Sequence, residues 1–123
     1  MVMLPAANRL RRGAEFRAVG RTGFRVGGPR LVVTMTTSQT LGHDGEPVRV
    51  GFSVGRSIGN AVVRNAVRRR LRHVMRERLG ELPPVSGVVV RALPAAADAS
   101  STVLGRDLDR ALARARERAG ATP

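Results

Sequence analysis

One change in hydrophobic period restricts the fold of this chain more than any other feature of its sequence. From Val48 to Val54 the apolar residues occupy alternate positions, a pattern that predicts a strand with one buried face. After Asn60 the apolar residues instead recur every three or four positions, which predicts an amphipathic helix. Because Asn60 is a good N-cap and Gly80 a good stop, we expect this helix to run for about five turns.

A further strand is expected after this helix. The pair Pro83-Pro84 prevents the helix from continuing, because proline lacks the amide hydrogen and its ring clashes with the preceding turn. The continuous apolar run Val88–Val90 that follows is typical of a strand covered on both faces. A strand, a helix and a strand in this order predict a helix packed on a sheet.

The residues before this unit predict a short helix and two strands. Gly13 is a candidate N-cap for a short helix that carries Phe16. Phe24–Val26 has the pattern of a brief strand, and the β-branched run Leu31–Thr36 that of a longer one.

After Pro94, Ser100 or Ser101 can cap a last helix. Its expected core positions are Leu104, Leu108, Ala111 or Leu112, and Ala115. The fold class is therefore α+β: a two-layer sandwich with the order helix, three strands, helix, strand, helix around a four-stranded mixed sheet. We expect one domain over residues 1–123, with residues 1–8 and 120–123 flexible.

Charge and residue usage point to a polyanionic partner. The 123 residues include 22 basic and 9 acidic side chains, a formal net charge of +13, and every basic residue is arginine. Guanidinium groups bind phosphate through paired hydrogen bonds, so phosphate recognition is the expected chemistry. The absence of cysteine and lysine excludes disulfides, thiolate nucleophiles, cysteine-ligated zinc and Schiff bases. No signal peptide or membrane span is evident, so we expect a cytoplasmic protein.

The predicted central helix carries the strongest basic pattern. Its apolar residues share one arc, and a row of arginines spaced four apart occupies the flank: Arg64, Arg68, Arg72 and Arg76. Like charges at this spacing repel, and the acid Glu77 is the only one in the stretch from Arg64 to Arg78. A solvated helix face normally mixes both signs of charge, so this uncompensated row predicts a polyanion site.

Two segments resemble the signature of the bacterial ribonuclease P protein subunit: Val50–Val54, and Ile58–Asn65 followed by Arg68-Arg69. The resemblance extends to Arg9–Arg12 and to Glu15-Phe16, and it covers nearly the whole chain. It implies an RNA-binding accessory subunit of a ribonucleoprotein endonuclease that removes the 5′ leader from precursor transfer RNA. It further implies that the RNA subunit is the catalyst, that Mg²⁺ is bound through that RNA and not by the protein, and that the strand–helix–strand crossover is left-handed.

The resemblance also assigns roles to individual residues. Contacts to the ribonuclease P RNA subunit are implied for Arg64, Asn65, Arg69 and Arg70. Contacts to the precursor transfer RNA leader are implied for Phe16, Thr34, Arg68 and Arg72, with Phe16 stacking on a base. Supporting basic residues are Arg9, Arg11, Arg12 and Arg76. No catalytic residue, no metal ligand, no small-molecule substrate and no membrane partner are expected.

This sequence departs from the family pattern at three positions. Ala66 stands where a second arginine of an Arg-Asn-Arg triplet is usual, so the contact of that arginine is either absent or made by Arg69 or Arg70. Gly20 and Thr34 stand where aromatic residues are usual, which reduces the stacking platform for the leader.

Other functions are less well supported. Metal-free RNA cleavage by the protein would need a general acid and base, and the two histidines, His43 and His73, lie in a predicted loop and in the arginine helix. A ribosomal-protein-like RNA-binding module, with no role in cleavage, would use the same charge and helix. Membrane-surface binding lacks the bulky aromatics it needs.

The last helix carries its own arginines, Arg106, Arg110, Arg114 and Arg118, which we expect to be compensated by Asp107, Asp109 and Glu117. The alternative is a second RNA contact on this helix.

Overall fold

The computed structural model describes residues 23–36, 48–82 and 87–121. The four strands of its described part are β1 (Phe24–Gly27), β2 (Leu31–Thr36), β3 (Arg49–Ser53) and β4 (Gly87–Ala92). The two α-helices are α2 (Ala61–Arg76) and α3 (Ser101–Ala121), and short 3₁₀ turns precede α2, follow it and precede α3. The short helix expected after Gly13 lies outside the described residues.

The strands form one mixed sheet in the order β1-β2-β4-β3. The pairs β1–β2 and β2–β4 are antiparallel, and β3–β4 is parallel, with Val50 opposite Val88. The parallel pair is joined through α2, as the strand–helix–strand pattern predicts. The α+β class and the four-stranded mixed sheet are therefore confirmed.

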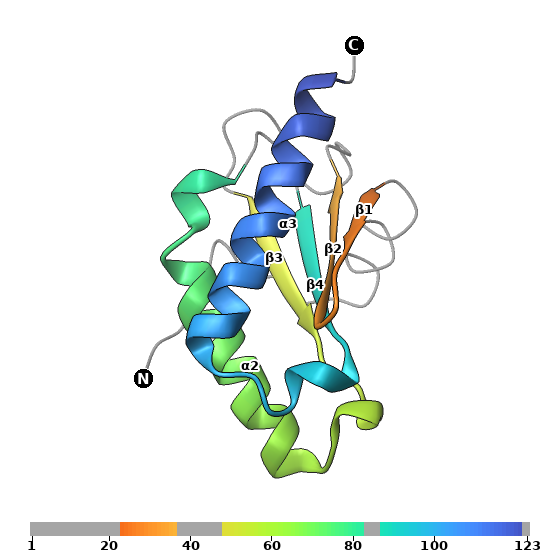
Figure 1. Ribbon diagram of the computed structural model, residues 1–123, viewed down its shortest axis with the longest axis vertical. Helices are drawn as coiled ribbons and strands as arrows, with labels where there is room; N and C mark the ends of the chain where they lie inside the picture. Colours follow the sequence, from red (N-terminus) through yellow and green to blue (C-terminus); the bar gives the residue numbers. More distant parts are fainter. Residues whose placement is uncertain (1–22, 37–47, 83–86, 122–123) are drawn as a thin grey trace.

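The crossover from β3 to β4 has the unusual hand. In the view of Figure 1, α2 and α3 lie in front of the sheet, both strands run downward, and β4 lies to the right of β3. When this view is turned so that the strands point upward, the chain passes from β3 through α2, in front of the sheet, to β4 on the left of β3. This is a left-handed connection. Almost all such connections are right-handed.

The core lies between the helices and one face of the sheet. Alternate strand residues point into it, among them Val33, Val50 and Val90, because successive side chains of a strand point to opposite faces. From α3 every expected core position is buried: Leu104, Leu108, Ala111, Leu112 and Ala115. Ala111 and Leu112, which the sequence pattern gives as alternatives, are both part of the core.

Two details differ from the expected pattern. Helix α2 ends at Arg76 and not at Gly80, because the chain tightens into a turn in which the Arg78 amide donates to the Met75 carbonyl at 2.9 Å. Strand β4 alternates buried and accessible residues, with Arg91 exposed, although it is an interior strand. It is therefore not covered on both faces along its length.

Candidate nucleic-acid interface

Helix α2 begins at a fixed position because of the two residues before it. The side-chain oxygen of Asn60 accepts a hydrogen bond from the Val63 amide at 3.0 Å, as expected of an N-cap. Gly59 has a φ of +152°, and a Cβ at this position would lie 3.1 Å from the Val63 side chain. A side chain at position 59 would therefore be strained, so glycine sets the entry into the helix.

The two flanks of α2 face different parts of the molecule. The buried side is formed by Val67, Leu71, Val74 and Met75. One flank faces α3, with which α2 packs, and on the other flank Arg68 contacts the backbone just beyond the edge strand β3. At 100° per residue the arginines at positions 64, 68 and 72 lie on the flank away from α3.

Arg68 connects this arginine flank to the sheet edge. One terminal nitrogen donates to the Asn65 side-chain oxygen at 3.1 Å, and the other donates to the backbone carbonyl of Val54 at 3.3 Å, just beyond β3. Two bonds therefore hold the guanidinium where α2 meets the end of β3. Next to it, the Nε of Arg64 is buried and has no hydrogen-bond partner among the residues described.

The remaining arginines of this region differ in exposure. Arg72 is half-buried on the same flank, and Arg69 and Arg76 are exposed toward solvent. Asn65 is exposed as well and is held by its bond with Arg68. The structure thus brings together Arg64, Asn65, Arg68 and Arg72 along one side of α2.

Arg70 does not join this group. Its guanidinium donates to the backbone carbonyls of Ala97 at 3.4 Å and Ala99 at 3.3 Å, in the segment that leads into α3. Because it lies on the flank facing α3, its contacts stabilise the packing of the two helices. The family resemblance assigns Arg70 the same role as Arg69, which is adjacent in sequence but is turned by 100° on the helix.

Thr34 is buried and lies apart from the arginines of α2. It pairs with Val89 of β4 and is only 8% exposed, on the sheet face opposite the helices. One strand, β4, separates its strand from β3, whose end Arg68 contacts. The other residues predicted to contact RNA, Phe16, Arg9, Arg11 and Arg12, lie outside the described residues.

His73 is the one histidine in the described part of the chain, and it lies beside a single acid. His73 lies 3.5 Å from a carboxylate oxygen of Glu77, one turn along α2, and both side chains are largely exposed. No three histidine or acidic side chains converge into a metal-binding group within the residues that the structure describes. None of the described helices is long and apolar enough to cross a membrane.

For Asp107 and Asp109, the expected compensation of the arginines on α3 is wrong. Asp107 is turned toward the sheet and pairs with Arg30 at 3.2 Å, and Asp109 is turned toward α2 and pairs with Arg78 at 2.7 Å. Both carboxylates are thus engaged away from the outer face of α3. Local sequence pattern does not indicate these pairs, because the partners lie 77 and 31 residues away.

Comparisons with known proteins agree on one family. The family model described as Ribonuclease P matches residues 4–116. The "Ribonuclease P protein component" of Streptomyces griseus is 54% identical over 116 residues, covering 91% of this chain and 94% of that protein. The protein of the same name from Mycobacterium avium is 45% identical over 112 residues, with the same coverage.

Solved structures show the same fold at lower identity. The ribonuclease P protein of Staphylococcus aureus superimposes with a TM-score of 0.77 at 24% identity, covering 89% of this chain and 96% of that one. The ribonuclease P protein of Thermotoga maritima gives a TM-score of 0.73 at 23% identity, covering 86% and 96%.

Proposed function

The chain belongs to the ribonuclease P protein family and is a protein component of ribonuclease P in transfer RNA processing, and we propose that it binds RNA through the arginine flank of α2. The observation that carries this proposal is the placement of Arg68. Its two bonds hold a guanidinium at the junction of α2 and β3, in line with Arg64 and Arg72. No acidic side chain of the described α2 lies among them, so phosphates are the fitting counter-charge.

We assign the RNA subunit contacts to Arg64, Asn65 and Arg69. The first two lie at the start of α2, and Arg69 is exposed on the adjoining side. Arg69 is the better replacement for the contact missing at Ala66, because the guanidinium of Arg70 already donates to two backbone carbonyls. In this proposal Arg70 positions α2 against α3.

The 5′ leader of precursor transfer RNA is assigned to Arg68, Arg72, Thr34 and Phe16. Since Thr34 lies on the far face of the sheet, a leader that contacts both it and Arg68 would pass around the edge formed by β3. Neighbouring strands lie about 4.8 Å apart, so the distance from β2 across β4 to β3 is about 10 Å. A few nucleotides of single-stranded RNA span that distance.

Catalysis is assigned to the RNA subunit. The protein would contribute binding energy and orientation, and the catalytic Mg²⁺ would be held through RNA phosphates. Support for this comes from the chemistry of the arginine flank, which attracts phosphates and repels free cations.

The test is cleavage of a precursor transfer RNA carrying a 5′ leader, at low Mg²⁺, by a bacterial ribonuclease P RNA with and without this protein. We expect little cleavage by RNA alone, correct 5′ cleavage with both, and none by the protein alone. Cleavage by the protein alone would overturn the assignment of catalysis to RNA. Tight RNA binding with no effect on cleavage would overturn the proposed role in leader binding.

A further inference from the structure

Helix α3 carries a second row of arginines that the proposed function does not use. Arg106, Arg110 and Arg114 are spaced four residues apart, and all three are exposed. They lie on the outer face of α3, opposite the core positions Leu108 and Leu112. Side chains at this spacing are neighbours on a helix, so their like charges repel.

The nearby acids do not compensate this row. Asp107 is 8% exposed and is bound by Arg30, and Asp109 is bound by Arg78 on the side of α3 that faces α2. Glu117 is exposed near the end of the row, and within the described residues no ion pair joins it to Arg114. Within the described residues, no ion pair therefore joins an acid to Arg106, Arg110 or Arg114.

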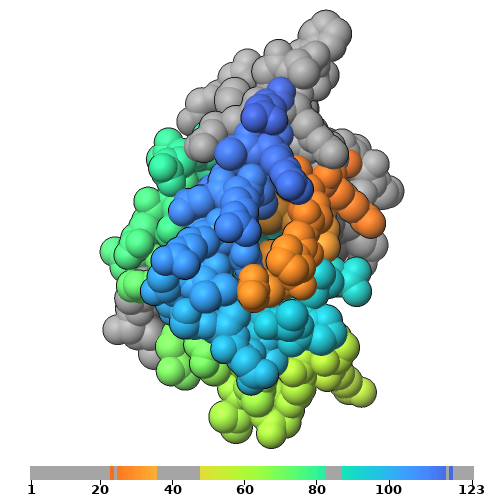
Figure 2. Space-filling model, viewed as in Figure 1, coloured from red at the N-terminus to blue at the C-terminus, as the bar shows by residue number. Residues whose placement is uncertain are grey.

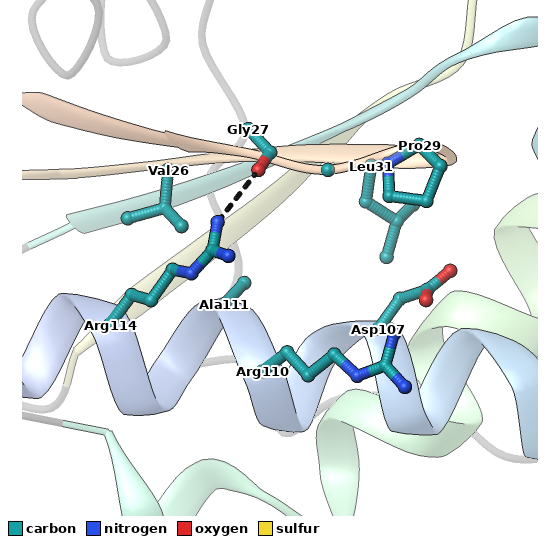
Figure 3. Close-up of a pocket in the computed structure, with 9 residues that line it drawn as sticks. Val26, Gly27, Pro29, Leu31, Asp107, Arg110, Ala111 and Arg114 are labelled. Atoms are coloured by element: carbon teal, nitrogen blue, oxygen red, sulfur yellow. Dashed lines mark hydrogen bonds between the residues drawn. The ribbon is translucent and has the colours of Figure 1, made fainter.

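A pocket lies beside two of these arginines. It has a volume of about 100 Å³ and lies between α3 and the turn that joins β1 to β2. Figure 3 shows Arg110, Arg114 and the carboxylate of Asp107 reaching from α3 along its edge, with the apolar side chains of Val26 and Leu31 on the opposite wall. An Nη of Arg114 donates to the Gly27 carbonyl at 3.5 Å, a long contact that leaves its remaining donors available.

This surface is separate from the arginine flank of α2. In Figure 2, α3 forms a ridge with α2 on one side and the β1–β2 hairpin on the other. The pocket lies on the hairpin side, whereas Arg68 lies at the opposite edge of the sheet, beside β3. One short RNA segment cannot occupy both places.

We propose that the arginine row of α3 and the adjoining pocket form a second RNA contact, which binds backbone phosphates. The guanidinium groups of Arg106 and Arg110 would pair with successive phosphates, and the pocket beside Arg110 and Arg114 would accept the next sugar or base edge along the strand. RNA is the fitting polyanion because the chain is a component of a ribonucleoprotein and carries a net charge of +13. The inference does not depend on the residue assignments made for α2.

Two RNAs of the same chemistry could occupy this site, and binding measurements distinguish them. The affinity of Arg106→Gln/Arg110→Gln would be measured across a range of salt concentrations, separately for a bacterial ribonuclease P RNA and for a precursor transfer RNA. We expect the slope of log affinity against log salt to fall by about 0.7 to 0.9 per lost phosphate contact for one of the two RNAs. The RNA that shows the reduced slope is the one bound by α3.

Matched variants make the result specific. Arg106→Lys/Arg110→Lys keeps the charge and should keep the slope, and Arg56→Gln removes an exposed charge elsewhere and should change neither RNA's slope by as much. Circular dichroism of each variant checks that it is folded. An unchanged slope for both RNAs, with a reduced slope for Arg68→Gln/Arg72→Gln, would overturn the second contact and leave the proposed function intact.

Discussion

The Nε of Arg78 donates a 2.7 Å hydrogen bond to Oδ1 of Asp109, which joins the end of α2 to the middle of α3. A terminal nitrogen of Arg78 also donates to the Val74 carbonyl at 2.8 Å, so the guanidinium is fixed from both helices. The hydrogen bond with Asp109 is the main cause that raises the pKa of Arg78, so this residue stays charged wherever the protein is folded. This pair and the contacts of Arg70 hold α2 so that its arginine flank faces away from α3.

Asp109→Asn is expected to lower the free energy of unfolding by about 0.5 to 1 kcal/mol, because it replaces a charged hydrogen bond that is partly exposed to water. Urea unfolding followed by circular dichroism measures this, since the chain has no tryptophan or tyrosine. Asp98→Asn, at an exposed acid outside this contact, is the matched control. Equal effects of the two variants would show that the Arg78 contact adds no stability.

Gly105→Ala should fail to give the gain of about 1 kcal/mol that alanine normally brings to a helix interior. A Cβ at this position would lie 2.8 Å from a terminal nitrogen of Arg78, which its bonds hold in place. The same substitution made together with Arg78→Ala should recover the gain. A gain of the same size in both backgrounds would contradict the close contact.

Asn60→Ala should destabilise the protein by about 1 kcal/mol, because the Val63 amide loses its capping partner. Ser100→Ala, which removes the corresponding 3.2 Å bond to the Val103 amide at the start of α3, is the comparison. Thermal unfolding gives both values. If Asn60→Ala also weakened RNA binding beyond its effect on stability, Asn60 would itself contact RNA.

Arg30→Met is expected to cost about 1 to 3 kcal/mol, because it leaves the buried carboxylate of Asp107 without its partner at 3.2 Å. Asp107→Asn should cost less, since an amide oxygen still accepts from Arg30. Unfolding experiments on the Arg30→Met and Asp107→Asn variants give the two free energies of unfolding, and their order tests the prediction. The reverse order would mean that the carboxylate is satisfied by other groups.

Arg68→Ala/Arg72→Ala should reduce the salt dependence of binding to single-stranded leader RNA by about 0.7 per lost phosphate contact. Asn65→Ala should have a smaller effect, because Arg68 keeps its bond to the Val54 carbonyl. Titration of a labelled leader at several salt concentrations gives the slopes. An unchanged slope in the double variant would place the leader site elsewhere on the protein.

Local pattern was sufficient to predict the elements and the basic surface of α2. The alternation from Val48, the helical spacing after Asn60 and the proline pair after α2 act through backbone geometry over a few residues. Sequence pattern over a few residues therefore predicted the positions of β3 and α2. The resemblance carried by Ile58–Asn65 indicated the family that the comparisons confirm.

The tertiary structure decided which charges are compensated. Asp107 and Asp109 are near the arginines of α3 in sequence, yet they are bound by Arg30 and Arg78 from other elements. Arg70 differs from its neighbour Arg69 for the same reason, because its guanidinium donates to two backbone carbonyls in the segment that leads into α3. Spacing along one helix fixes only which residues share a face, whereas the partner of each face depends on strand order and helix packing, which bring together residues far apart in sequence.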